Sequence, residues 1–163
     1  MSGADLGPEE RLDRLWSTEQ IRQLVARYAF HLDRRDLDSL VALFAGDVRG
    51  LFERPLREVQ VTILDVGTHV IDFADADTAS GSVYCRAEIQ DGERWIHQAI
   101  RYDDAYVRRD GDWYFLRRDH QLFYGAEVGV NPLGLPPANW PERHDGLGTL
   151  PYDQSSWQDF WGS

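Results

Sequence analysis

The sequence predicts an α+β fold in which N-terminal helices pack against an antiparallel β-sheet. Two observations carry this prediction. Apolar residues recur every three or four positions between residues 21 and 44, which is typical of amphipathic helices. Between residues 57 and 124, apolar and polar residues mostly alternate, and Asp-Gly pairs at 91–92 and 110–111 indicate tight turns between successive strands.

Two helices are expected, separated by a short polar break at residues 34–36. The first is expected to begin at Ser17 or Thr18, where a hydroxyl precedes acidic and amide residues, and Asp36 can cap the second. The apolar stripes are Ile21, Leu24, Val25, Tyr28 and Leu32 in the first helix, and Leu37, Leu40, Val41 and Phe44 in the second.

After the helices, residues 46–55 are expected to form a turn and a short strand that Pro55 stops, and residues 57–64 alternate like a strand. Val61, Ile63, Ile71 and Phe73 would then share one inward face with His69, unless a bulge at Gly67 changes the register. Residues 82–89, 94–107 and 113–124 complete an antiparallel meander.

Length and composition fit one domain, because 163 residues with 42% apolar content can bury a substantial core. We expect an N-terminal arm at 1–14, the domain at 15–125, and a tail at 126–163 that packs on the body or on a partner subunit through Trp140, Trp157, Phe160 and Trp161.

The charge balance restricts the partners. A net charge of −11 and a pI near 4.7 argue against nucleic acid and against an anionic membrane surface. The single cysteine, Cys85, excludes an intramolecular disulfide, and the first sixteen residues contain no apolar run, so we expect a cytoplasmic protein.

Several motifs together resemble the SnoaL-like, or nuclear-transport-factor-2-like, superfamily. They are Arg27-Tyr28, Asp33, and the segments 36–44, 67–72, 83–88 and 101–113. The resemblance covers about residues 15–125 and implies a cone in which a curved antiparallel sheet and the N-terminal helices enclose one apolar pocket. Enzymes of the superfamily usually place a third helix at the pocket mouth, and here we expect it to be shortened or missing.

The resemblance implies a catalytic role for Asp33 and His69. In the dehydratase and dehydrochlorinase branches, an aspartate at the position of Asp33 orients a histidine that transfers a proton. The family histidine aligns with Ile63 or Leu64, and His69 matches a second position, so His97 and His120 are alternative bases. Asp33 can equally be a solvated carboxylate paired with Arg34 or Arg35, and His69 a structural histidine.

Tyr28 resembles the tyrosine that stabilises an oxyanion in ketosteroid isomerase, although it also lies on the core stripe. Arg101 and Asp103 have the spacing of a water-activating pair in limonene epoxide hydrolases, or form an ordinary ion pair within the sheet. The expected substrate-binding residues are Tyr84, Trp95, His97, Arg101, Asp103 and His120.

No cofactor and no metal are expected, because the histidines are scattered and neither a phosphate-binding glycine loop nor a serine nucleophile motif is present. We therefore expect a cofactor-free acid/base enzyme, a dehydratase, isomerase or cyclase, acting on a small hydrophobic or polycyclic compound.

Two alternatives stay open: a non-catalytic small-molecule-binding or assembly protein of the same fold, and, more weakly supported, an accessory β-subunit of a ring-hydroxylating oxygenase. The expected partners are a small apolar ligand and a second copy of the chain, because one face of the sheet is rich in Tyr, Trp and Arg.

Overall fold

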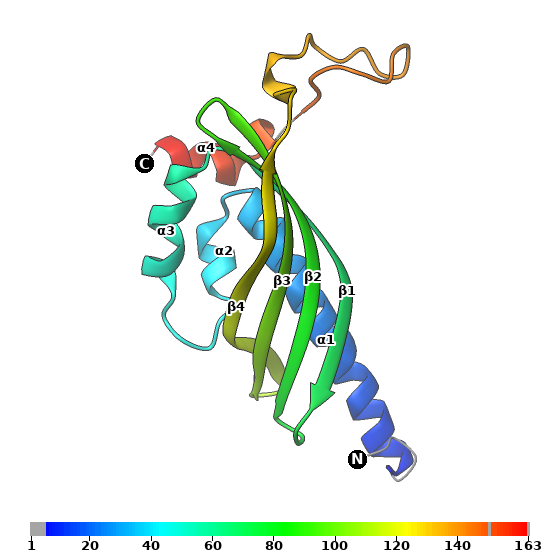
Figure 1. The fold of residues 1–163 in the computed structure, drawn as a ribbon. Coiled ribbons are helices and arrows are strands. Elements are labelled where there is room, and N and C mark those ends of the chain that lie inside the picture. The colour runs from blue at the N-terminus through cyan, green and yellow to red at the C-terminus, as the bar shows by residue number, and fades with distance from the viewer. Residues whose placement is uncertain (1–5, 150, 163) are drawn as a thin grey trace.

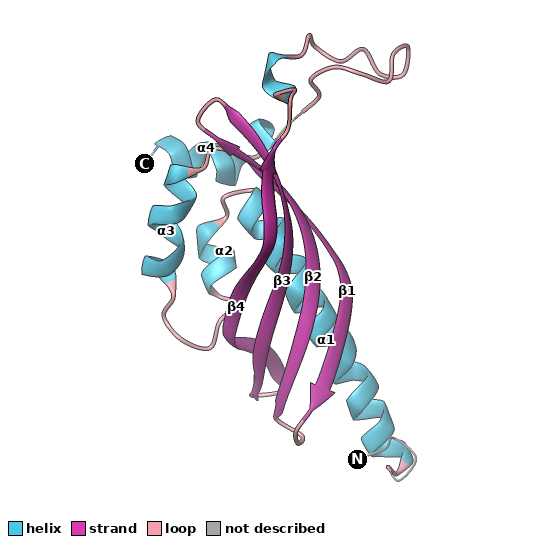
Figure 2. Ribbon diagram, in the orientation of Figure 1, coloured by secondary structure: helices cyan, strands magenta, loops and turns pink. Residues whose placement is uncertain are grey.

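A computed structural model describes residues 6–149 and 151–162 of the chain. A four-stranded antiparallel sheet in the order β1-β2-β3-β4 curves around the long first helix (Figure 1), as the predicted α+β fold requires. Figure 2 shows the shorter helices gathered near one end of the sheet. The elements are α1 (Pro8–Asp33), α2 (Leu37–Val41), α3 (Arg49–Glu58), β1 (Thr62–Phe73), β2 (Thr78–Asp91), β3 (Arg94–Arg109), β4 (Asp112–Glu127), η1 (Pro132–Gly134), η2 (Pro151–Asp153) and α4 (Ser155–Gly162).

The first helix begins earlier than the sequence suggested. Pro8 occupies the first turn, where a missing N–H costs nothing, and the backbone N–H of Gly7 donates to Glu10 Oε2 at 2.9 Å. Ser17 and Thr18 therefore lie inside the helix, where the Thr18 hydroxyl donates to the Arg14 carbonyl. The start predicted at Ser17 or Thr18 is wrong, and residues 8–14 of the expected arm are helical.

The strand expected within residues 46–55 is also wrong, because α3 is a helix of ten residues that contains Pro55. Phe52 and Leu56 are spaced by one helical turn and face the core, where Leu56 is 5% exposed. This apolar pair outweighs the helix-breaking effect of Pro55. A helix thus occupies the segment where the third helix was expected to be short or missing, and the next strand begins only at Thr62.

A β-bulge divides β1 into two halves. The pairing register with β2 shifts between Val66 and His69, next to Gly67. Before the shift Leu64 and Val66 pack against the core, and after it Ile71 and Phe73 do. Ile63 is 38% exposed, so the prediction that it shares the inward face is wrong. The bulge flips the pattern and leaves His69 half-buried.

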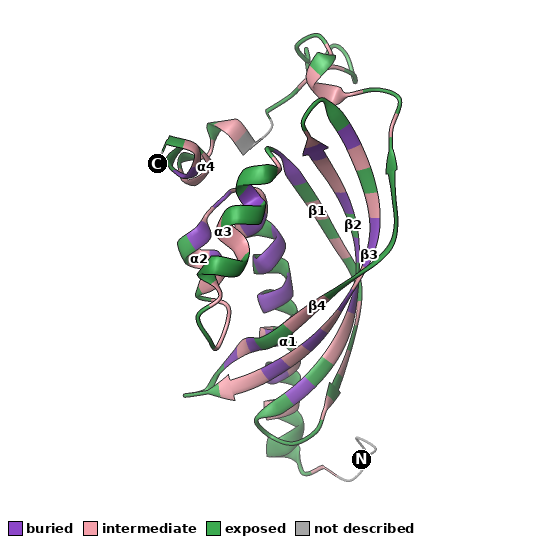
Figure 3. Ribbon diagram, turned by 60° about the vertical axis from the view of Figure 1, so that its left-hand side comes forward, coloured by how far each residue is buried: buried purple, intermediate pink, exposed green. Residues whose placement is uncertain are grey.

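The core lies between α1 and the concave face of the sheet (Figure 3). Tyr28 is at its centre, since its ring packs edge-on against four other aromatic rings at centroid distances of 5.8–6.3 Å: Phe44, Phe52, Tyr102 and Phe115. Such pairs stabilise beyond the area that they bury. Aromatic side chains therefore fill the space between the helices and the middle of the sheet.

Part of the C-terminal tail packs on the body. Phe160 in α4 is 6% exposed, its ring lies 4.5 Å from the Arg57 guanidinium, and its carbonyl accepts from Arg57 Nη1. The Ser156 hydroxyl donates to the carbonyl of Arg34 at the end of α1. Trp140, in contrast, is 72% exposed, so its expected cover by a partner stays a prediction.

The outer face of the sheet exposes Tyr84, Phe123 and Tyr124, each by about half. The structure describes one chain, so the expected homodimer through this face stays a prediction. Within the described residues, no helix combines the length and the apolar character needed to span a bilayer.

Replacing Phe160 with alanine tests the role of α4. We expect Phe160→Ala to lower the free energy of unfolding by about 3 kcal/mol, because it empties a buried aromatic site and removes the contact with Arg57. Urea denaturation measures the change. Trp140→Ala is the matched control and should change stability by less than about 0.5 kcal/mol. Equal effects of the two substitutions would show that α4 does not dock as described.

Candidate functional site

A buried ion pair joins β3 and β4. Asp104 and Arg118 are directly opposite each other in the sheet, and the guanidinium binds the carboxylate with both arms, Nε to Oδ1 at 2.8 Å and Nη2 to Oδ2 at 2.6 Å. The side chains are 0% and 4% exposed, respectively. A bidentate pair of this kind is among the strongest polar contacts available to a protein.

Aromatic rings surround the guanidinium of Arg118. Its central carbon lies 4.3 Å from the centroid of Tyr28, 4.2 Å from that of Tyr102 and 4.4 Å from that of Phe115. These ring faces attract the cation while they exclude water. Burial lowers the pKa of Arg118, but the hydrogen bonds and charge of Asp104 raise it by more, so the residue stays charged.

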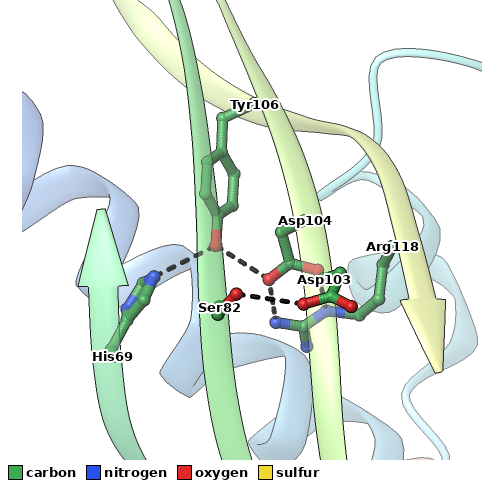
Figure 4. Close-up of polar contacts among 6 residues, drawn as sticks. All are labelled: His69, Ser82, Asp103, Asp104, Tyr106 and Arg118. Carbon is green, nitrogen blue, oxygen red and sulfur yellow. Dashed lines mark hydrogen bonds and ion pairs between the residues drawn. The ribbon is translucent and has the colours of Figure 1, made fainter. Parts of the chain in front are cut away.

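Tyr106 and His69 extend this pair toward the first strand (Figure 4). The Tyr106 hydroxyl donates to Asp104 Oδ2 at 2.7 Å, and His69 Nε2 lies 3.1 Å from the same hydroxyl oxygen. Both oxygens of Asp104 accept from Arg118, and Oδ2 also accepts from Tyr106, so the single hydroxyl hydrogen of Tyr106 points to Asp104. His69 must then donate from Nε2, and in the neutral ring the lone pair is on Nδ1.

Burial lowers the pKa of His69 to about 4; the charge of Asp104 opposes this effect, while Arg118 and Arg22 add to it. The ring is therefore neutral at pH 7, and its free Nδ1 can accept a proton. Burial, followed by the charge and hydrogen bond of Asp104, raises the pKa of Tyr106 well above its ordinary value. Tyr106 consequently acts as a fixed hydrogen-bonding link and does not ionise.

Gly81 makes room for this arrangement. A Cβ atom at Gly81 would lie 2.8 Å from the Val70 carbonyl oxygen, 3.0 Å from the Tyr106 ring and 3.1 Å from His69 Nε2. Any larger residue would push His69 and Tyr106 apart. The absence of a side chain at Gly81 on β2 therefore lets His69 lie beside Tyr106.

Asp33 is at the other end of β1. Its carboxylate accepts from Thr62 Oγ1 at 3.0 Å and from the backbone N–H of Leu64 at 2.9 Å. Leu64 and His69 are five residues apart on one strand, or roughly 15 Å. The structure does not bring the predicted pair together, and Leu64, one of the two positions expected to hold the family histidine, lies beside the carboxylate.

Burial raises the pKa of Asp33 to about 6, although the hydrogen bonds from Leu64 and Thr62 and the charge of Arg35 oppose the shift. Arg35, expected as an ion-pair partner, instead donates mainly to backbone carbonyls. Its guanidinium, in a side chain that is 1% exposed, binds the carbonyl oxygens of Leu32, Val59 and Gln60 and the hydroxyl of Thr62. Asp33 and Arg35 together fasten the end of α1 to the start of β1.

The remaining predicted residues are divided between the two faces of the sheet. Tyr28 is in the core, where burial raises its pKa to about 12. Arg101 and Asp103 form the predicted pair, 2.8 Å from Nη2 to Oδ2, but they belong to the face opposite the core, where Ser82 also donates to Asp103. His120 packs against the ring of Tyr102 at 5.6 Å.

Tyr84, Trp95 and His97 do not join the His69 network either. Tyr84 packs against Phe123 on the outer face. Glu88 accepts from Trp95 Nε1 at 2.8 Å and lies 3.5 Å from His97 Nε2. The described residues contain no group of three or more His, Cys, Asp or Glu side chains that can hold a metal ion.

Sequence reasoning did not select Asp104, Tyr106 or Arg118. The alternation of side chains along β3 could have identified the first two. Arg101 and Asp103 share one face of the strand, so Tyr102, Asp104 and Tyr106 must share the other face, beside the apolar core. A charged residue flanked by two tyrosines on the inward face then requires a buried partner.

Gly81→Ala tests the close packing of His69 and Tyr106 against Gly81. We expect the substitution to lower the free energy of unfolding by about 2 kcal/mol, because the added methyl group overlaps the Val70 carbonyl and the rings of His69 and Tyr106. Gly67→Ala is the control on β1, since a Cβ there meets only the Tyr84 carbonyl at 3.7 Å. Thermal unfolding compares the stability of the two variants. An equal loss of stability in both would contradict the close packing described at Gly81.

The raised pKa of Asp33 predicts a dependence of stability on pH. The folded protein holds this proton up to about pH 6, compared with 3.8 for an ordinary aspartate, so Asp33 stabilises the fold below about pH 4 relative to higher pH. The contribution is lost as the pH rises through 6 and amounts to at most about 3 kcal/mol. Urea denaturation at pH 4, 5, 6 and 7 measures it.

Asp33→Asn provides the comparison, because an amide cannot ionise. The free energy of unfolding of the variant, relative to that of the parent protein, should rise between pH 4 and pH 7. A constant difference across this range would show that Asp33 titrates normally.

The chain is similar to a known domain family and to several solved structures. The SnoaL-like domain matches residues 13–59 and 50–119. Among curated proteins, none matches the chain. The crystal structure of LinA superposes with a TM-score of 0.71 at 23% identity, covering 78% of this chain and 99% of LinA.

Two further structures are similar. Hexachlorocyclohexane dehydrochlorinase LinA-type3 from Novosphingobium barchaimii LL02 has a TM-score of 0.67 at 21% identity, over 78% of this chain and 99% of that one. A candidate scytalone dehydratase from Novosphingobium aromaticivorans DSM 12444 has a TM-score of 0.64 at 20% identity, over 73% and 92%. The fold and the domain match establish that this chain belongs to the SnoaL-like family, within the nuclear-transport-factor-2-like superfamily.

Proposed function

We propose that the chain is a cofactor-free acid/base enzyme of the lyase or isomerase type, in which His69 is the base. One observation carries the proposal: a half-buried, neutral histidine is fixed in a single tautomer by Tyr106, which a buried Asp104–Arg118 pair holds in turn. A base oriented by a hydrogen-bonded carboxylate is the usual arrangement for proton abstraction.

The reaction that fits this geometry is an elimination. His69 Nδ1 takes a proton from carbon, the C–H electron pair forms a carbon–carbon double bond, and the leaving group departs with its own bonding pair. The imidazolium is stabilised by Asp104 through Tyr106 and later returns its proton to water. Because a base with a pKa of about 4 is weak, the substrate must carry a C–H that neighbouring groups make acidic.

The proposed substrate class, a small hydrophobic ring compound, rests on the similar structures. The names of the similar structures, a hexachlorocyclohexane dehydrochlorinase and a candidate scytalone dehydratase, describe eliminations from cyclic compounds. At identities of 20–21% they support the class of reaction only by analogy.

A non-catalytic binding protein is the second candidate. Leu64 is next to Asp33, so the aspartate–histidine pair of the family cannot form there. The two oxygens of Asp33 instead accept from Thr62 and Leu64, which is a structural use of the carboxylate. In this alternative the chain binds a small molecule without turning it over.

His69→Gln separates the two candidates. Glutamine keeps an N–H near the position of Nε2, so the bond to Tyr106 survives, but it lacks a basic nitrogen. We expect the release of chloride from hexachlorocyclohexane, or of water from scytalone, to fall at least about 100-fold. His97→Gln, on the exposed outer face, is the matched control and should leave the rate unchanged.

The pH profile provides an independent measurement. The rate should be flat from about pH 5 to pH 8 and fall as the pH drops through 4, where His69 takes up a proton. Turnover that His69→Gln does not reduce would exclude this base. Binding of either compound without any turnover would favour the second candidate.

A further inference from the structure

A groove on the flank of α1 is separate from the His69 network. It has a volume of about 560 Å³ and lies between one stripe of α1, the end of α2 and the start of β4. The residues that line it include Trp16, Gln20, Arg27, His31, Trp113 and Tyr114. The residues of α1 that face the core, such as Ile21, Val25 and Tyr28, are on the neighbouring side of the helix.

Backbone pairing holds the walls of the groove in place. Phe115 on β4 donates its N–H to the Leu43 carbonyl and accepts from the Ala45 N–H, both at 2.9 Å. The segment after α2 is thereby joined to β4 like an added strand. The volume is within the range of sites that hold small organic molecules.

Three polar atoms of this lining are buried without a hydrogen-bond partner among the described residues: Gln20 Oε1, His31 Nδ1 and Trp113 Nε1. His31 Nδ1 does lie 3.4 Å from Asp36 Oδ2, beyond good hydrogen-bond geometry. A buried polar atom left unpaired is costly, and native proteins rarely keep one without a reason. Gln20 Oε1 and Trp113 Nε1 have no such nearby group recorded among the described residues, which indicates that a bound molecule completes them.

Gln20 and Trp113 both line the groove. Gln20 reaches the turn that precedes Trp113, since its Nε2 lies 3.5 Å from the carbonyl oxygen of Gly111. Gln20 offers an acceptor and Trp113 offers a donor. A hydroxyl group can satisfy both, because it donates one hydrogen and accepts through its oxygen.

The rest of the lining favours a flat, uncharged molecule. Trp16 is 58% exposed and offers an open indole face, and Tyr114 lies across the groove on β4. The lining holds two carboxylates, Glu19 and Asp112, and one guanidinium, Arg27, so its charges are mixed and partly offset each other. Aromatic stacking contributes binding without a charge requirement.

We propose that this groove binds a planar aromatic compound that carries a hydroxyl group, at a site distinct from His69. The ring stacks on Trp16, and the hydroxyl donates to Gln20 Oε1 and accepts from Trp113 Nε1. The site is independent of the proposed elimination.

The test is a titration of the isotope-labelled protein with 2-naphthol, followed through the indole N–H resonance of Trp113 and the ring protons of His69. We expect the Trp113 resonance to shift in a saturable manner while His69 does not respond. With 2-methoxynaphthalene, which has the same rings but no hydroxyl hydrogen, binding should be at least about fivefold weaker, the worth of one hydrogen bond.

Gln20→Leu keeps the size of the side chain and removes the acceptor, so 2-naphthol should bind about fivefold more weakly. Gln23→Leu is the control in the same groove, because the Gln23 amide is already bonded to Glu19 at 2.8 Å. An unmoved Trp113 resonance, equal binding of the two naphthalenes, equal effects of the two substitutions, or a response centred on His69 would each overturn the proposal.

Discussion

The Asp104–Arg118 pair is the interaction on which the rest of the interior depends. Removing two charges from water is costly, and their attraction compensates only when the geometry is good and the remaining polar atoms are bonded. Here the guanidinium binds with both arms, Tyr106 occupies one carboxylate oxygen, and rings cover the cation. Each neighbour is therefore constrained: an apolar residue at 106 would leave a carboxylate lone pair without its donor, and a smaller residue at 28 would admit water.

The same pair determines the state of the histidine. Because the hydroxyl hydrogen of Tyr106 is donated to Asp104, His69 can bind this hydroxyl only as a donor through Nε2. The bulge before His69 supplies the other half of the arrangement, since it changes the face on which the residue lies. A neutral ring with a free Nδ1 follows from these two constraints and needs no contact with Asp33.

The elements that produce a periodic pattern of apolar residues could be predicted from the sequence. Features that depend on the tertiary contacts of individual residues could not. The stripe in α1 and the meander of β2, β3 and β4 followed from apolar spacing. Pro55 suggested a break, yet the spacing of Phe52 and Leu56 keeps α3 helical. Asp104 was overlooked because aspartate is seldom buried, and the Asp33–His69 pair was expected because a motif gives no distance along a strand.

Asp33 shows why a family motif does not by itself transfer a mechanism. The residue is at the matching position, but its carboxylate receives two hydrogen bonds from β1, and the buried Arg35 next to it binds the carbonyls at the ends of α1 and α3. A carboxylate so fully engaged joins the helix to the sheet. In the proposed function the proton transfer depends instead on His69, a half-buried ring elsewhere along β1 with a charged network behind it. The proposal thus assigns a structural role and a chemical role to two positions of one strand: Leu64 bonds to Asp33 and joins β1 to α1, and His69 acts as the base.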